Sequence, residues 1–129
     1  MDLTKEQEYL NSVTEKIIGC AFAVSRGLGV GFLEKVYENA LAHEIGKTGL
    51  KVEQQVAIKV IYDGIVVGDY IADLLVDEKV IIELKAVGEL QEVHVAQALN
   101  YLKATGHKIC LLLNFGQPKL QIRRIVNNF

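Results

Sequence analysis

The sequence has little proline, little cysteine and no excess of positive charge. Proline occurs once in 129 residues and half of the residues are apolar, which predicts one ordered globular domain, residues 1–129, without a disordered tail. The net charge is −2, so no strongly basic surface favours nucleic-acid binding, and any such contact must come from a local patch. The longest apolar runs are far too short to cross a bilayer, so we expect no membrane association.

Thiol and imidazole chemistry is equally sparse. Cys20 and Cys110 lie far apart in apolar surroundings and without Cys-x-x-Cys spacing, which favours buried free thiols in a reducing compartment. The N-terminal stretch MDLTKEQEYL is polar and unlike a signal peptide, so we expect a cytoplasmic protein. The three histidines lack ligand spacing, which leaves a zinc enzyme as a weak interpretation.

Apolar periodicity predicts the order of the secondary structure. A capping box of Thr4 and Gln7 begins a helix whose apolar stripe runs to Leu28. The near-continuous apolar run 108–115 is typical of a central strand that pairs in parallel with an earlier one. The whole pattern predicts an α/β fold with a mixed sheet: helices over 4–28 and 32–48, a three-stranded meander over 51–62, 65–77 and 80–86 with a hairpin turn at Asp63-Gly64 and a bulge at Gly68, a helix over 89–105, and strands over 108–115 and 120–126.

Two of these helices carry polar residues beside the expected core stripe. Glu34 either sits in a first turn, where the helix dipole favours an acid, or reaches the end of the sheet as an extra carboxylate. Gln97, one turn before Tyr101, is either a satisfied half-buried amide or turned toward a ligand. The expected core residues are Leu33, Val36, Tyr37, Ala40, Leu41 and Ile45 in the second helix, and Leu90, Val93, Ala98, Tyr101 and Leu102 in the third.

The stretch 70–86, YIADLLVDEKVIIELKA, places three charges in two apolar strands. Strict alternation puts Asp73 on one face with Ile71 and Leu75, and Glu83 on one face with Lys85. A turn centred on Glu78 would place Asp73 opposite Glu83, with their Cβ atoms roughly 4.5–5.5 Å apart.

Two carboxylates at such a spacing repel each other, and burial adds to the penalty. A hard divalent cation would remove it, because Mg²⁺ and Mn²⁺ prefer oxygen ligands. Lys85 on the same face could orient a water or stabilise negative charge. The alternative is a salt-bridged surface, in which Lys85 neutralises Glu83 and Asp73 faces water at the end of its strand. This alternative stays open because such a spacing of charges also arises by chance in a chain with 23% charged residues.

The motifs together resemble a known family. The run Gly31-Phe32-Leu33-Glu34-Lys35-Val36-Tyr37 resembles the signature of the GxxExxY proteins, which belong to the PD-(D/E)xK nuclease superfamily. The resemblance extends over residues 14–126 and implies a restriction-endonuclease-like core.

The resemblance also implies roles for individual residues. Asp73 matches the first acid of the motif, with Ala72 in place of the usual proline, and Glu83-Leu84-Lys85 matches the E-x-K. The metal ligands would be Asp73, Glu83, the Leu84 carbonyl and the helical acid Glu34, and Lys85 would position the attacking water. Gln97 and Tyr101 resemble the Q-x-x-x-Y element of exonuclease-like members and, with Tyr37, would contact substrate.

These observations predict an Mg²⁺- or Mn²⁺-dependent nuclease acting on DNA, with RNA as the second choice. The alternative is a catalytically silent module that uses the same fold to bind a protein partner or nucleic acid. Dimerisation through the edge strand or the first helix is a further expectation.

Overall fold

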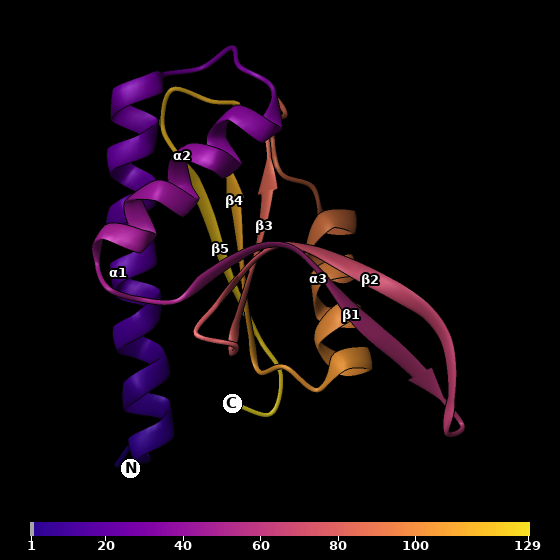
Figure 1. Cartoon of the computed structure of the whole chain (residues 1–129). Helices are drawn as coiled ribbons and strands as arrows, with labels where there is room; N and C mark the ends of the chain where they lie inside the picture. Colours follow the sequence, from indigo (N-terminus) through magenta and orange to yellow (C-terminus); the bar gives the residue numbers. More distant parts are fainter. Residues whose placement is uncertain (1) are drawn as a thin grey trace.

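A computed structural model describes residues 2–129, in which helices cover both faces of one mixed sheet (Figure 1). The order of elements is the predicted one, so the mixed α/β class is confirmed. The bounds are α1 Lys5–Leu28, α2 Glu34–Lys47, β1 Val52–Tyr62, β2 Ile65–Val76, β3 Val80–Lys85, α3 Glu92–Thr105, β4 Ile109–Asn114 and β5 Gln121–Val126.

The predicted start of α1 is confirmed in detail. The Thr4 hydroxyl accepts a hydrogen bond from the Gln7 backbone N–H, and the Gln7 side chain accepts one from the Thr4 backbone. This reciprocal capping satisfies two N–H groups that the helix itself cannot pair. The buried side of α1 is the predicted stripe, with Leu10, Val13, Ile17, Ala21 and Val24 in the core.

The sheet has the strand order β1-β2-β3-β4-β5. β3 and β4 run parallel and the other neighbours are antiparallel. Every residue of β4 is buried, as expected for a strand covered on both faces, and β5 forms one edge. The parallel pair matters for the site because it aligns the carboxyl ends of β3 and β4 at one end of the sheet.

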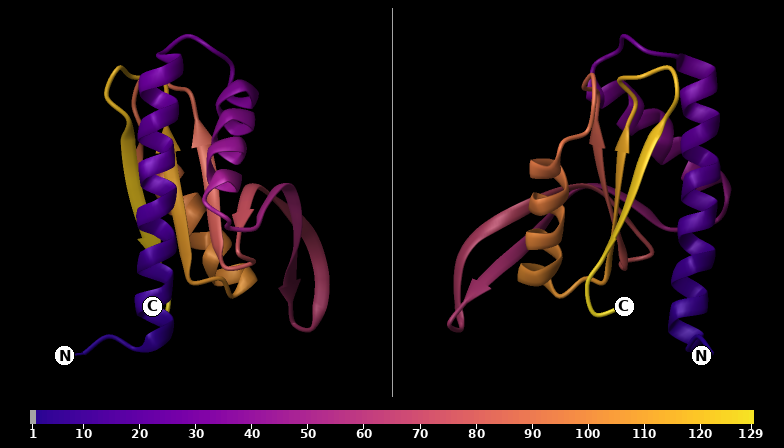
Figure 2. Two further views of the ribbon diagram at one scale, coloured as in Figure 1. Left: turned by 60° about the vertical axis from the view of Figure 1, so that its left-hand side comes forward. Right: turned by 180° about the vertical axis from the view of Figure 1, so that it is seen from behind.

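Two hydrophobic clusters lie on opposite faces of the sheet. α1 and α2 cover one face, and α3 covers the other (Figure 2). β3 alternates between them as predicted: Val80, Ile82 and Leu84 pack toward α1 and α2, while Ile81 packs on the α3 side.

The prediction of strict alternation in β2 is wrong, because β2 changes faces at Asp73. Ala72 packs in the α3-side cluster, whereas Leu74 packs toward α1 and α2, and Leu75 joins the α3 side. β1 changes faces at the residue opposite, Gln55, whose backbone has a positive φ of 53°. This left-handed residue redirects the side chains that follow it, and the hairpin bends past α3 (Figure 1).

Three expected core residues are instead exposed. Leu33, 81% exposed, is the N-cap residue of α2 and therefore precedes its first turn. Val36 and Val93 are also exposed, because each lies beside the strip of its helix that meets the sheet. The buried strip of α2 is narrower than predicted and consists of Tyr37, Glu38, Leu41 and Ile45.

The two predicted hairpin turns are confirmed. Asp63-Gly64 joins β1 to β2 with both residues at positive φ, which is the conformation that such two-residue hairpins require. The predicted irregularity at Gly68 is a register shift, in which Val67 has no partner on β1. Asp77 and Glu78, also left-handed, form the turn before β3.

Two glycine substitutions should have opposite effects on stability. Gly106 ends α3 at φ 81°, so Gly106→Ala should lower the free energy of unfolding by about 1 kcal/mol. Gly19 lies inside α1 with open space around its Cα, so Gly19→Ala should raise it by about 0.5–1 kcal/mol. Urea unfolding of both variants checks this, and a shift of the same sign in both would contradict it.

Candidate active site

The candidate site lies where β2 stops pairing with β3. The antiparallel pairs run from Val76–Val80 to Leu74–Ile82, and Asp73 and Glu83 are the next residues of the two strands. An extra N–H is therefore available on β3, and the Leu84 backbone donates it to Asp73 Oδ2 at 2.9 Å. The end of strand pairing brings the two predicted acids together.

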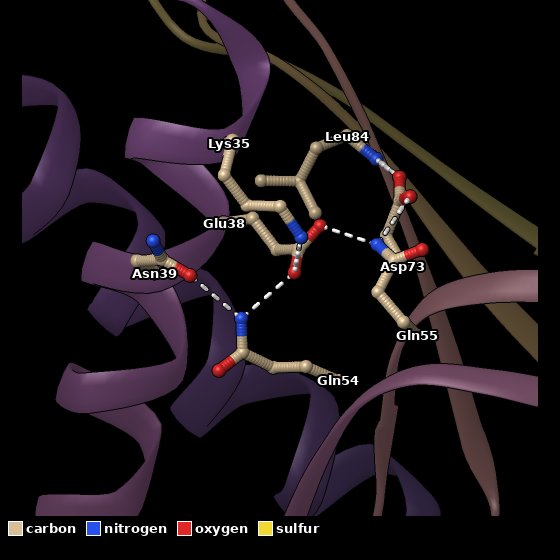
Figure 3. Close-up of polar contacts among 7 residues, drawn as sticks. All are labelled: Lys35, Glu38, Asn39, Gln54, Gln55, Asp73 and Leu84. Carbon is tan, nitrogen blue, oxygen red and sulfur yellow. Dashed lines mark hydrogen bonds and ion pairs between the residues drawn. The ribbon is translucent and has the colours of Figure 1, made fainter.

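A polar network on the α2 side reaches Asp73 (Figure 3). The Gln55 amide donates to Glu38 Oε1 at 2.6 Å and lies 3.5 Å from Asp73 Oδ1. Glu38 is only 4% exposed and also accepts hydrogen bonds from Lys35 at 3.0 Å and Gln54 at 2.7 Å. Asp73 is thus held from both sides, by the backbone of β3 and by an amide that α2 keeps in place.

Glu83, beside Asp73, is held from the side of α3. Its carboxylate accepts a hydrogen bond from the Tyr70 hydroxyl. The Tyr70 ring stacks on Tyr101 of α3, with ring centroids 3.8 Å apart and planes inclined by 17°. This stacking holds the Tyr70 ring in place and so sets the direction from which its hydroxyl donates to Glu83.

Burial makes both acids reluctant to ionise. Burial raises the pKa of Glu83 to about 7, with the neighbouring charge of Asp73 adding to the rise. The pKa of Asp73 is raised as well, first by burial and also by the charge of Glu38. When both acids are ionised, the folded protein therefore carries an electrostatic penalty that a bound cation would reduce.

The predicted polar residues of β3 and α3 line one small pocket. It is lined by Glu83 and Lys85 of β3, by Gln97 and Tyr101 of α3, and by His94, Ala98 and Leu112. Within the part of the chain that the structure describes, Lys85 forms no salt bridge, so no carboxylate neutralises its ammonium directly. The spacing of Gln97 and Tyr101 on α3 therefore brings both residues to the pocket that Glu83 also lines.

Glu34 and Tyr37 lie elsewhere. Glu34 is exposed in the first turn of α2, and the acid of this helix that reaches Asp73 is Glu38, one turn later. Tyr37 is 1% exposed, stacks on Phe115, and its hydroxyl donates to the Gly29 carbonyl at 2.7 Å and accepts from the Phe32 N–H. In this arrangement Tyr37 anchors the glycine-rich loop between α1 and α2.

The donor set fits a hard divalent cation with few protein ligands. Among residues 2–129, no three His, Cys, Asp or Glu side chains gather in a metal-binding cluster. Asp73 and Glu83 would supply the two carboxylates, and the Leu84 carbonyl would add a neutral oxygen. Mg²⁺ binds in this way because it keeps several waters and takes one or two carboxylates.

Three residues of the site were missed from the sequence: Glu38, Gln55 and Tyr70. Glu38 had a usable signal, because it is four residues from Glu34 and so lies on the same side of the helix. Gln55 and Tyr70 had none, since their roles follow from the bend of the β1–β2 hairpin.

Comparisons with known proteins give the family and a fold of the same kind. Residues 11–125 match the model of a family described as the PD-(D/E)XK nuclease superfamily. No curated protein matches the chain. The crystal structure of an alkaline exonuclease (LHK-Exo) from Laribacter hongkongensis is similar in fold, with 18% sequence identity and a TM-score of 0.53 over 98% of this chain and 73% of that chain.

A phenylalanine at position 37 should test the anchoring role of Tyr37. Tyr37→Phe removes the hydroxyl of a buried side chain and with it two hydrogen bonds, so the free energy of unfolding should fall by about 1–3 kcal/mol. Tyr62→Phe, at an exposed position, is the matched control and should change it by less than about 0.5 kcal/mol. Unchanged stability with weakened nucleic-acid binding would instead restore the substrate-contact role.

The stability of the metal-free protein should depend on pH through Glu83. Between 4.5 and about 7, folded Glu83 keeps a proton that the unfolded chain loses, so the stability of metal-free protein falls as pH rises through this window. Glu83→Gln removes this effect and should stabilise the metal-free protein above that window by about 1–3 kcal/mol, with a smaller gain near the lower limit. Urea unfolding in chelator at both ends of the window checks this, and a gain independent of pH would contradict it.

Proposed function

Because the chain belongs to the PD-(D/E)XK nuclease superfamily, we propose that it is a nuclease that hydrolyses phosphodiester bonds of DNA, with RNA as the second choice. The observation that carries the proposal is the convergence of Asp73, Glu83 and Lys85 at the end of β2–β3 pairing, beside a pocket lined by α3. The chain would belong to the GxxExxY group, on the strength of Gly31, Glu34 and Tyr37.

A bound Mg²⁺ or Mn²⁺ would supply Lewis-acid activation of phosphate and water at the two carboxylates. The residues of the chain provide the rest. Lys85 would orient the attacking water and stabilise negative charge on phosphate, since its ammonium shares the pocket with Glu83. Gln97 would hold a water or a phosphate oxygen from the opposite wall, and Tyr101 would contact the nucleic acid beside it.

Glu38 and Gln55 would position Asp73 rather than touch substrate. Glu38 accepts a hydrogen bond from the Gln55 amide, and this bond keeps the amide turned toward Asp73. Glu34 remains proposed as a further acid near the metal, although its exposed place in the first turn of α2 gives it no contact with the pair. Tyr37 contributes through the loop that it anchors.

A cleavage assay tests the proposal. Wild-type protein should degrade single- or double-stranded DNA in Mn²⁺ or Mg²⁺, and chelator should stop it. Glu83→Gln and Lys85→Met should each lower the rate about 100-fold or more, because each removes a group that acts at the reacting phosphate. Lys119→Met, in an exposed loop, is the control and should leave the rate unchanged.

Equal residual cleavage by wild type and Glu83→Gln would mean a contaminating nuclease and would overturn the proposal. Calorimetry of Mn²⁺ binding then tests the alternative, a silent module that binds a protein or nucleic acid. The hydrogen bond from Tyr70 to Glu83 favours this alternative, since it satisfies one oxygen of the carboxylate from within the protein. Absence of Mn²⁺ binding by wild type would support the silent module.

A further inference from the structure

The outer part of the β1–β2 hairpin extends from the body of the protein (Figures 1 and 2). We call residues 56–72, beyond the bend at Gln55 and Asp73, the hairpin arm. Its inner face packs on the α3-side cluster through Val56, Ile58, Val60, Tyr70 and Ala72. Nothing in residues 2–129 covers its opposite, outer face, whose side chains are exposed.

The outer face has a simple composition. It consists of three cross-strand pairs in a row, apolar, charged and apolar: Ala57 with Ile71, Lys59 with Asp69, and Ile61 with Val66. Ile61, Val66 and Ile71 are each about half exposed, at 51%, 50% and 47%. A two-stranded hairpin is marginally stable in water until it is packed. The arm is packed on its inner face alone, so a partner on the outer face would stabilise it further.

The charge of the arm argues against nucleic acid as that partner. Between residues 56 and 72 the charged side chains are Lys59, Asp63 and Asp69, one positive and two negative. A phosphate backbone requires a positive surface, whereas this face offers apolar side chains around one lysine and one aspartate of opposite charge. The chemistry fits a protein surface of the same kind.

We propose that the occupant is a second copy of this chain, packed outer face to outer face about a two-fold axis parallel to the strands. Such an axis lays β1 of one copy over β2 of the other, at the same level along the strands. Lys59 then faces Asp69 of the second copy, and Asp69 faces its Lys59. The apolar pairs also meet apolar pairs, so the face is complementary to itself, as a two-fold interface requires.

The charges select this axis over the alternative. An axis across the strands would lay β1 over β1, with Lys59 against Lys59 and Asp69 against Asp69. Like charges placed against each other in an interface are strongly unfavourable. Packed sheets lie about 10 Å apart and keep their strands within about 30° of each other, which the parallel axis satisfies.

Charge reversal tests the proposal without reference to catalysis. Light scattering of the full chain should give a mass that rises with concentration toward twice 14.3 kDa. Lys59→Glu makes both charges of the face negative and Asp69→Lys makes both positive, so each variant alone should dimerise about tenfold more weakly or worse. An equimolar mixture of the two should dimerise again, and the double variant should regain self-association.

Recovery in the mixture also shows that both variants fold. Lys119→Glu, in an exposed loop, is the matched control and should dimerise like the wild type. A monomeric wild type from micromolar to millimolar concentration would overturn the proposal, and the face would then belong to a different partner. A dimer that neither reversal weakens, or a mixture that stays monomeric, would overturn it as well.

Discussion

The structure around the site depends on two acids that are hard to ionise. They lie at the point where β2 stops pairing with β3. Asp73 and Glu83 lie one residue beyond the last β2–β3 pair, and burial raises the pKa of both. Each is nevertheless hydrogen-bonded, Asp73 by the Leu84 backbone and Glu83 by the Tyr70 hydroxyl. Such bonds offset part of the penalty of burying a polar group, while the repulsion between the two acids remains.

That balance explains why the surrounding structure is irregular. If β2 kept its alternation and its pairing through Asp73, the acid would lie on one face of the sheet. It would then be near α2 or near α3, but not between them. The left-handed backbone of Gln55 and the change of faces at Asp73 accompany a different arrangement, in which the Asp73 carboxylate meets the Gln55 amide and the Leu84 N–H while Glu83 is bonded by Tyr70. Residues in sparsely populated backbone regions often occur at functional sites, where the surrounding structure holds them.

The sequence predicted the elements well because their signals are local. The capping box of α1, the Asp63-Gly64 turn and the apolar run of β4 each depend on residues close together in the chain. The parts that failed depend on distant contacts. Alternation predicted one face for Asp73 and Leu75, but the bend that separates them arises where β1 meets α2 and α3.

The same distinction applies to the site. The E-x-K spacing alone put Glu83 and Lys85 on one face of β3, and the helical period put Gln97 beside Tyr101, so the pocket could be anticipated. The acid on α2 could be anticipated only as a choice between two positions one turn apart. Glu34 carried the motif, whereas Glu38 bonds the Gln55 amide beside Asp73, because the direction in which α2 crosses the sheet is a property of packing.

The likeness to the Laribacter exonuclease, at 18% identity, concerns the fold, so the chemistry must be argued from the residues of this chain. Those residues also link the site to the hairpin arm. Tyr70, which contacts Glu83 from the inner face, lies between Asp69 and Ile71 of the outer face. Successive residues of a strand point to opposite faces, so a partner that immobilises the outer face also restricts the backbone that carries Tyr70. Association through the arm and the placement of the Glu83 carboxylate therefore depend on the same three residues of β2.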